Sequence, residues 1–332
     1  MDLKVIDLKQ ELNKRATTFN KELEIFLKNG QPKALYDAVR YLPLAGGKRL
    51  RPCISMLSCE AVHGEIKKVI PLAIALELIH NFTLVHDDIM DKSHLRRNLP
   101  AVHIEFGEPT AIMAGDLLFA KAFEIMHSIP MDANIFKKLD YGLVKCVEEI
   151  CEGQQLDVEF EKRENVREDE YLQMILKKTA FLFMFGSEGG AIAGGGKVDE
   201  IKGLKEYGKS LGLGFQIWDD YLDLSSDEKT LGKDIGNDIR NGKKTLIAVH
   251  SFNNAAGDDK KLLKGIFGNK NASEQDIKKV FELFRKTKSL EYAKNTALNY
   301  SAKAKKALDV LDDSNAKQIL MDLADYSIER EK

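Results

Sequence analysis

Residues 71–92 read PLAIALELIHNFTLVHDDIMDK, and this stretch says most about how the chain folds. Apolar residues dominate its first part, and a proline at its start suits the first turn of a helix, so we predict one apolar helix over Pro71–Lys92. Three aspartates, Asp87, Asp88 and Asp91, gather where this helix ends. The helix dipole disfavours negative charge at the carboxyl end, and neighbouring carboxylates repel one another. A local rule broken in this way is typical of a functional site.

The same acidic pattern, Asp-Asp-x-x-Asp, recurs later in the chain. Residues 214–227 read GFQIWDDYLDLSSD and place Asp219, Asp220 and Asp223 at the end of a second apolar helical run. One copy could arise by chance, but two copies at the ends of two apolar helices are poorly explained as solvated faces. Magnesium usually binds one or two carboxylates together with substrate phosphates. We therefore predict that the two acidic patches face one another across magnesium ions and a phosphate group.

The composition is that of a large helical protein. The chain has 332 residues, of which 44% are hydrophobic, and a net charge of −2. Neither the charge nor a basic stripe indicates a nucleic-acid partner. All seven prolines lie at or before Pro130, and the rest of the chain shows helical periodicity with little strand-like alternation. We predict an all-α bundle in a single domain over residues 1–332.

The sequence also gives an expected location. The amino-terminal segment mixes charges from its start and lacks the apolar core of a signal peptide, and the apolar run Phe181–Phe185 is too short to span a bilayer. Four cysteines show no metal-ligand spacing and are most simply reduced thiols: Cys53, Cys59, Cys146 and Cys151. We expect a cytoplasmic protein without stable membrane insertion.

Cationic residues lie close to both acidic motifs. Gly46–Pro52 reads GGKRLRP and suits a loop that embraces a phosphate, although a charged helix start would look the same. Arg96 and Arg97 follow the first motif and could either pair with its aspartates or bind a phosphate. His80, two turns before that motif, could bind an anion or be a satisfied buried histidine. The aromatic residues of Phe181–Phe185 favour core packing, although some could line a pocket for a cation.

Taken together, these stretches resemble the trans-isoprenyl diphosphate synthases. The matches run in family order from Gly46 to Thr245: GGKRLRP, HNFTLVHDDIMDKSHLRR, GD at 115–116, GQQLD at 153–157, KT at 178–179, and FQIWDDYLD followed by GKDIGNDIRNGKKT. The resemblance implies a helical bundle around a deep central cavity, and usually a homodimer. One departure is Asn98, where the family usually has glycine. Asparagine tolerates a left-handed backbone, so we expect the turn to survive.

The resemblance implies a role for each matching residue. Asp87 and Asp91, supported by Asp88, and Asp219, with Asp220 and Asp223 alongside, would hold about three magnesium ions, which Mn²⁺ could replace. The isopentenyl diphosphate site would comprise Lys48, Arg51, His80 and Arg97. The allylic diphosphate would bind Arg96, Lys178, Lys233 and Lys243, while Thr179 and Gln216 would face the nascent carbocation.

The implied reaction is a head-to-tail prenyl transfer. An allylic diphosphate (dimethylallyl, geranyl or farnesyl) ionises, and the double bond of isopentenyl diphosphate attacks the cation. Phe82 beside the smaller Thr83, one turn before the first motif, matches the family pattern for a geranylgeranyl product. Alternatives are a farnesyl or longer-chain synthase, a class I terpene cyclase, and a non-catalytic subunit or metal-binding scaffold. The GGKRLRP stretch and the intact second acidic motif count against the cyclase and the scaffold.

Overall fold

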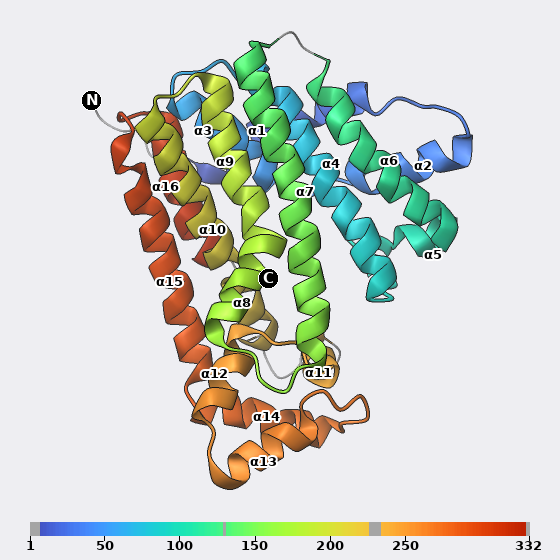
Figure 1. Cartoon of the computed structure of the whole chain (residues 1–332), viewed down its shortest axis with the longest axis vertical. Helices are drawn as coiled ribbons and strands as arrows, with labels where there is room; N and C mark the ends of the chain where they lie inside the picture. The colour runs from blue at the N-terminus through green and yellow to red at the C-terminus, as the bar shows by residue number, and fades with distance from the viewer. Residues whose placement is uncertain (1–6, 129–130, 226–233, 330–332) are drawn as a thin grey trace. The chain divides into compact units, whose positions relative to one another are not determined.

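The computed structural model describes residues 7–128, 131–225 and 234–329, and nearly all of its regular structure is helical (Figure 1). Within those residues the strands are β1 (Leu95–Arg96) and β2 (Leu99–Pro100), which form a short antiparallel hairpin. The predicted all-α fold is therefore confirmed.

The chain divides into two compact units. Unit 1 comprises Met1–Val147, Phe185–Lys205 and Leu308–Asp322, and unit 2 comprises Glu148–Met184, Glu206–Ala307 and Leu323–Lys332. Four of the five boundaries fall inside helices, namely α7 (Ala133–Lys162), α9 (Phe181–Gly194), α10 (Val198–Ser225) and α16 (Asn315–Glu329), and the fifth lies between Ala307 and Leu308. The assignment of the whole chain to one domain stays a prediction.

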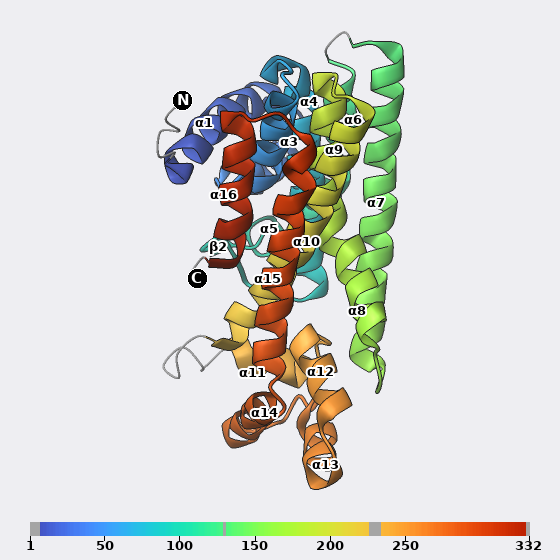
Figure 2. The same ribbon diagram turned by 90° about the vertical axis from the view of Figure 1, so that its left-hand side faces the viewer.

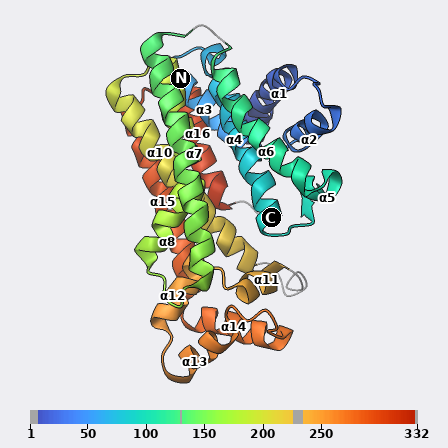
Figure 3. The ribbon, with the colours of Figure 1, turned by 45° about the vertical axis from the view of Figure 1, so that its right-hand side comes forward.

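Unit 1 is built around α4 (Ile66–Met90), which packs between α3 (Leu50–Ala61) and α6 (Glu108–Met126) (Figure 3). The other complete helices of this unit are α1 (Leu8–Phe26), α2 (Lys33–Leu44) and α5 (Val102–Phe106), with the 3₁₀ helix η2 (Leu308–Val310). Most residues of α4 from Val69 to Ile79 are buried, which explains why its sequence is apolar on all sides.

The predicted start of this helix was wrong. The helix begins at Ile66 rather than at Pro71, and it ends at Met90 with Asp91 as its C-cap. Pro71 lies inside the helix, where its missing N–H removes one backbone hydrogen bond. Burial of the apolar residues on both sides of Pro71 keeps the helix continuous through this gap.

Helix α4 also has the length and composition of a membrane span. These properties are weak evidence for a membrane-spanning helix, because the core helices of soluble proteins share them. In α4, 67% of the most apolar 18-residue segment is buried inside the protein. Its apolar residues contact neighbouring helices of the same unit, so the structure gives the apolar surface a protein partner.

Unit 2 contains α8 (Glu168–Ile175), α11 (Asp234–Asn241), α12 (Leu246–Asn254), α13 (Gly257–Ile266), α14 (Glu274–Lys286) and α15 (Ser289–Ala307). Figure 2 shows α12, α13 and α14 gathered at one end of α15. The proline-free stretch 282–311 is divided between α14 and α15, because Thr287 ends α14 and Lys288 has a positive φ of 57°.

A short π-helix, η1 (Leu176–Ala180), joins α8 to α9. Two glycines allow other helices to pack closely against it. A Cβ at Gly153 on α7 would lie 2.3 Å from the backbone nitrogen of Lys178, and a Cβ at Gly212 on α10 would lie 2.6 Å from the Cα of Ala180. Single π-turns within helices often occur at functional sites, and this one carries Lys178 and Thr179.

A buried ion pair fixes the GGKRLRP stretch in unit 1. Arg49 is 4% exposed, has a left-handed φ of 49°, and binds Glu77 on α4 with one guanidinium nitrogen. Its other nitrogens donate to Asn20 Oδ1 at 2.9 Å and to the carbonyl of Pro43 at 2.5 Å. Glu77 is itself 3% exposed and also lies 3.9 Å from Arg97.

Removing the charge of Glu77 should destabilise the fold. Glu77→Gln leaves the buried guanidinium of Arg49 without a compensating charge, so we expect the free energy of unfolding in urea to fall by about 3 kcal/mol. The control is Asp37→Asn, which breaks the exposed pair with Lys33 and should change that free energy by less than about 0.5 kcal/mol. Equal losses in the two variants would contradict the importance of the buried pair.

Candidate active site

The first acidic motif divides its three carboxylates between two environments. Asp88 is fully buried and accepts three hydrogen bonds from Arg96, from Nε at 3.0 and 3.2 Å and from Nη2 at 2.5 Å. Asp87 is half-buried and Asp91, the C-cap of α4, is exposed. The outer two carboxylates, one helical turn apart, therefore remain accessible on one face.

The arginines after this motif are held by the β1–β2 hairpin. Arg97 and Asn98 form its two-residue loop with positive φ angles of 54° and 62°, so the expected left-handed backbone at Asn98 is confirmed. Arg97 donates to the carbonyls of Leu42, at 3.1 Å, and Gly46. The Arg97 guanidinium also lies against Gly47, where an added Cβ would come within 3.1 Å of it. The hairpin thus joins the glycine-rich loop to the first acidic motif.

Three of the residues predicted to bind isopentenyl diphosphate lie together in unit 1. Arg51 Nη1 is 3.3 Å from His80 Nε2, and the charge of Arg97 acts on the same imidazole. Burial lowers the pKa of His80 well below its ordinary value, and the charges of Arg51 and Arg97 add to this effect. His80 is therefore neutral near pH 7, and the positive charge of the cluster belongs to its arginines. Lys48, the fourth predicted residue, is exposed on the preceding loop.

The second acidic motif, like the first, has one buried carboxylate and two accessible ones. Asp220 is 4% exposed, and its two oxygens accept hydrogen bonds from the Tyr171 hydroxyl at 2.8 Å and from Gln216 Nε2 at 3.1 Å. Burial raises the pKa of Asp220 to about 6. Asp219 and Asp223, one turn apart, are half-buried and accessible.

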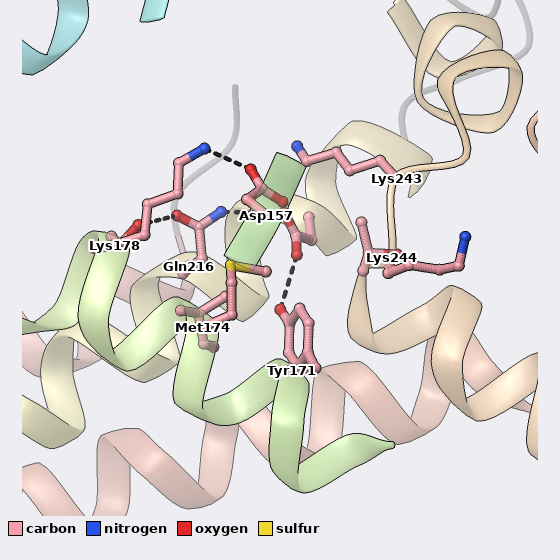
Figure 4. Close-up of a pocket in the computed structure, with 11 residues that line it drawn as sticks. Asp157, Tyr171, Met174, Lys178, Gln216, Lys243 and Lys244 are labelled. Carbon is pink, nitrogen blue, oxygen red and sulfur yellow. Dashed lines mark hydrogen bonds and ion pairs between the residues drawn. The ribbon is translucent and has the colours of Figure 1, made fainter. Parts of the chain in front are cut away.

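A pocket of about 130 Å³ lies beside this motif in unit 2 (Figure 4). Its polar wall includes Asp157, Lys178 and Thr179 together with Gln216 and Lys243, while Met174 and Ile175 supply apolar surface. The Lys178 ammonium binds Asp157 at 2.5 Å, and the Thr179 hydroxyl donates to Gln216 Oε1 at 2.9 Å. The structure therefore brings together the residues of this unit that the sequence predicts for one site.

Lys243 faces several carboxylates. Its Nζ is 3.6 Å from Asp238, and although burial opposes its charge, the carboxylates of Asp220, Asp238 and Asp157 raise its pKa. Lys244 turns away from Lys243 (Figure 4): it donates to the carbonyl of Gly242 and lies over the ring of Phe267. Both lysines line the pocket, but the ammonium of Lys244 is engaged by Gly242 and Phe267, whereas that of Lys243 faces Asp238.

Some functional candidates were missed or cannot be placed. Asp157 contacts Lys178 and Asp238 contacts Lys243, and both lysines are predicted site residues. In the sequence, only the position of these two aspartates within the stretches that match the family indicated a functional role. Lys233 lies outside the described residues. The prediction that the two acidic motifs face one another stays a prediction.

The chain-length residues lie on α4 in unit 1. The half-buried ring of Phe82 packs 5.7 Å from the ring of Phe119 on α6, and Phe119 packs 5.2 Å from Phe123. Thr83 is half-buried and bonds the carbonyl of His80. The sequence pattern indicated Phe82, but the two partner rings on α6 were identified only from the tertiary structure.

The carboxylates fit magnesium when a ligand supplies further oxygens. Among the described residues no three metal-ligating side chains converge. The accessible pairs are Asp87 with Asp91 and Asp219 with Asp223, and magnesium commonly binds one or two carboxylates together with water and substrate phosphates. Asp88 and Asp220 fit poorly as direct ligands, because their oxygens already accept hydrogen bonds from the protein.

Comparison with known proteins gives one consistent family. The polyprenyl synthetase family model matches residues 32–284. The chain is 42% identical to a geranylgeranyl diphosphate synthase of Methanosarcina mazei, over 98% of this chain and 99% of that protein. It is 45% identical to a short chain isoprenyl diphosphate synthase of Methanothermobacter thermautotrophicus, over 90% and 91% of the two chains. The crystal structure of geranylgeranyl pyrophosphate synthetase from Pyrococcus horikoshii superposes with a TM-score of 0.93 at 42% identity, covering 98% of this chain and 99% of that one.

The lowered pKa of His80 makes the fold sensitive to acid. Below about pH 6.5 the unfolded chain takes up a proton that folded His80 does not, so stability falls by up to about 1.4 kcal/mol per pH unit. His80→Gln should lose less unfolding free energy than the wild type between pH 7 and pH 5, as measured by urea denaturation. His127→Gln, which changes an exposed histidine at the end of α6, should follow the wild type. Parallel wild-type and His80→Gln curves would rule out a buried neutral His80.

Proposed function

The chain belongs to the polyprenyl synthetase family and is a prenyltransferase, and we propose that it adds isopentenyl diphosphate to allylic diphosphates to make geranylgeranyl diphosphate. One observation carries the proposal: in both acidic motifs two carboxylates one turn apart are accessible, and cationic side chains of the same unit lie close by. This is the arrangement needed to hold a diphosphate through divalent ions. Relatives with this activity cover nearly the whole chain.

We propose that Asp87 with Asp91, and Asp219 with Asp223, bind the magnesium ions. Bound magnesium would neutralise the charge of the diphosphate leaving group. Asp88 has a different task, since it holds the guanidinium of Arg96 beside the outer carboxylates. Arg96 is one-third exposed and keeps part of its donor surface for a diphosphate oxygen.

The residues of unit 2 suit the allylic substrate. Lys178 and Lys243 line the pocket and would bind diphosphate oxygens, exchanging their carboxylate partners for the ligand. As the allylic C–O bond breaks, these ammonium groups stabilise the charge that develops on the departing oxygen. Met174 and Ile175 provide an apolar wall that keeps water from the cation.

In unit 1 the cluster of Lys48, Arg51 and Arg97 suits the diphosphate of isopentenyl diphosphate. Its charge is permanent, because His80 stays neutral and arginines do not titrate near pH 7. Held there, the double bond of isopentenyl diphosphate can attack the allylic cation, and the loss of a proton then completes an addition of five carbons. Binding fixes the orientation of the two substrates, and no protein side chain needs to act as a nucleophile.

We further propose a cytoplasmic homodimer. Apolar side chains are exposed on two consecutive helices of unit 1: Ile112 and Met113 on α6, and Tyr141 and Val144 on α7. Such side chains are more often covered than left in water when they recur along helix faces, and a second copy of the chain would cover them.

The reaction and its metal can be tested together. Purified protein with labelled isopentenyl diphosphate and each allylic primer should form a twenty-carbon product after dephosphorylation, and EDTA should abolish the reaction until magnesium is restored. Asp87→Asn and Asp219→Asn should each lower kcat by about 100-fold or more, because one ligand and its charge are lost. Hydrocarbon formed from the allylic primer alone would indicate a cyclase, and turnover in EDTA would contradict the metal role.

Product length should follow the size of residues 82 and 83. Phe82→Ala removes the ring that packs against Phe119 and opens space along α4, so products should lengthen beyond twenty carbons. Thr83→Phe adds a second ring at the same level and should shift products towards fifteen carbons. Both are measured by chromatography of the dephosphorylated products. Unchanged lengths in both variants would place the end of the tail pocket elsewhere.

A further inference from the structure

Three hydrogen bonds in unit 2 converge on Asp220, and two of them link this carboxylate to the pocket through Gln216 and Thr179. The Thr179 hydroxyl donates to Gln216 Oε1 at 2.9 Å, and Gln216 Nε2 donates to one oxygen of Asp220 at 3.1 Å. The other oxygen of Asp220 accepts from the Tyr171 hydroxyl at 2.8 Å. Thr179 and Gln216 line the pocket, and Figure 4 shows Gln216 on its wall, with the hydroxyl of Tyr171 below it bonded to the carboxylate of Asp220.

The buried carboxylate sets this direction. An ionised Asp220 can only accept hydrogen bonds, so the amide of Gln216 must turn its NH₂ group towards Asp220 and its oxygen towards Thr179. The single hydroxyl hydrogen of Thr179 is then committed to Gln216. What Thr179 can offer the pocket is its oxygen lone pairs, made more electron-rich by the chain behind it.

Tyr171 holds the carboxylate of Asp220 in the position from which it orients the amide of Gln216. Its ring is fully buried, and its hydroxyl donates to Asp220 Oδ2 at 2.8 Å. The tyrosine hydrogen is therefore directed to Asp220. Neither Tyr171 nor the orientation of Gln216 follows from the acidic motif itself.

We propose that Asp220 and Tyr171 are positioning residues that fix the direction of the hydrogen-bond chain, so that Thr179 presents lone pairs rather than a hydrogen to the pocket. The inference rests on the proposed prenyl transfer, because a reaction that builds positive charge in this pocket is stabilised by lone pairs and opposed by a hydroxyl hydrogen. In this arrangement Asp220 acts through Gln216 and Thr179 and not as a metal ligand.

The test reverses the chain and then restores it. In Asp220→Asn the new oxygen can still accept from Tyr171, but the new NH₂ group must donate to position 216. The Gln216 amide then turns over and donates to Thr179, whose hydrogen is displaced towards the pocket. In the double variant Asp220→Asn with Gln216→Glu, the carboxylate at position 216 accepts from both neighbours, and the original direction at Thr179 returns.

We expect kcat of Asp220→Asn to fall by about 100-fold and that of the double variant to recover at least about tenfold, with KM for isopentenyl diphosphate changed by less than about threefold. Gln216→Glu alone should be impaired, since it places two carboxylates against each other. Tyr171→Phe should lower kcat by about 3- to 10-fold. Tyr207→Phe, which removes another buried hydroxyl from unit 2, is the matched control and should keep wild-type kcat.

Wild-type kcat in Asp220→Asn, no recovery in the double variant, or an equal loss in Tyr207→Phe would overturn the proposal. A wild-type protein without prenyl transfer would instead defeat the proposed function. The hydrogen-bond chain can still be tested in that case by a double-mutant cycle on thermal unfolding at positions 216 and 220. The chain predicts strongly non-additive Tm shifts for the two substitutions, and additive shifts would refute it.

Discussion

The buried carboxylate in the middle of each acidic motif is the constraint on which the site depends. Asp88 is bonded by Arg96, and Asp220 by Tyr171 and Gln216, within their separate units. A buried carboxylate without such donors would cost several kcal/mol or become protonated. Protein donors thus hold the middle carboxylate of each motif in the interior, while the two outer carboxylates are half-buried or exposed.

The cationic residues show the same division between one buried, paired residue and its neighbours. Arg49 is buried and paired with Glu77, which leaves Lys48 and Arg51 on either side of it in the chain for a ligand. The buried Lys244 places its Nζ over the ring of Phe267 and donates to Gly242, whereas Lys243 faces the carboxylate of Asp238. In each run of charges one residue is buried and bound by the protein while its neighbours point elsewhere, since adjacent residues on a helix or loop point in different directions.

Much of the fold and site could be predicted from the sequence, and the misses have physical causes. Apolar periodicity and the absence of proline after Pro130 identified the helices, but the start of α4 was placed at Pro71 because a proline inside a helix is normally avoided. Asp157 and Phe119 were missed because each acquires its role from a partner distant in sequence, Lys178 and Phe82 respectively. The π-helix that carries Thr179 has no recognised sequence signature.

The sequence by itself determined the helical class, the family, the two acidic motifs and the cationic residues that accompany them, because all of these depend on residue type and spacing. Only the tertiary structure decided which carboxylate of each motif faces the interior. Positions i and i+4 of a helix share a face and position i+1 diverges from it, but what meets the divergent side chain depends on packing. A hairpin supplies Arg96 to Asp88, and α8 supplies Tyr171 to Asp220, and no local pattern specifies either contact.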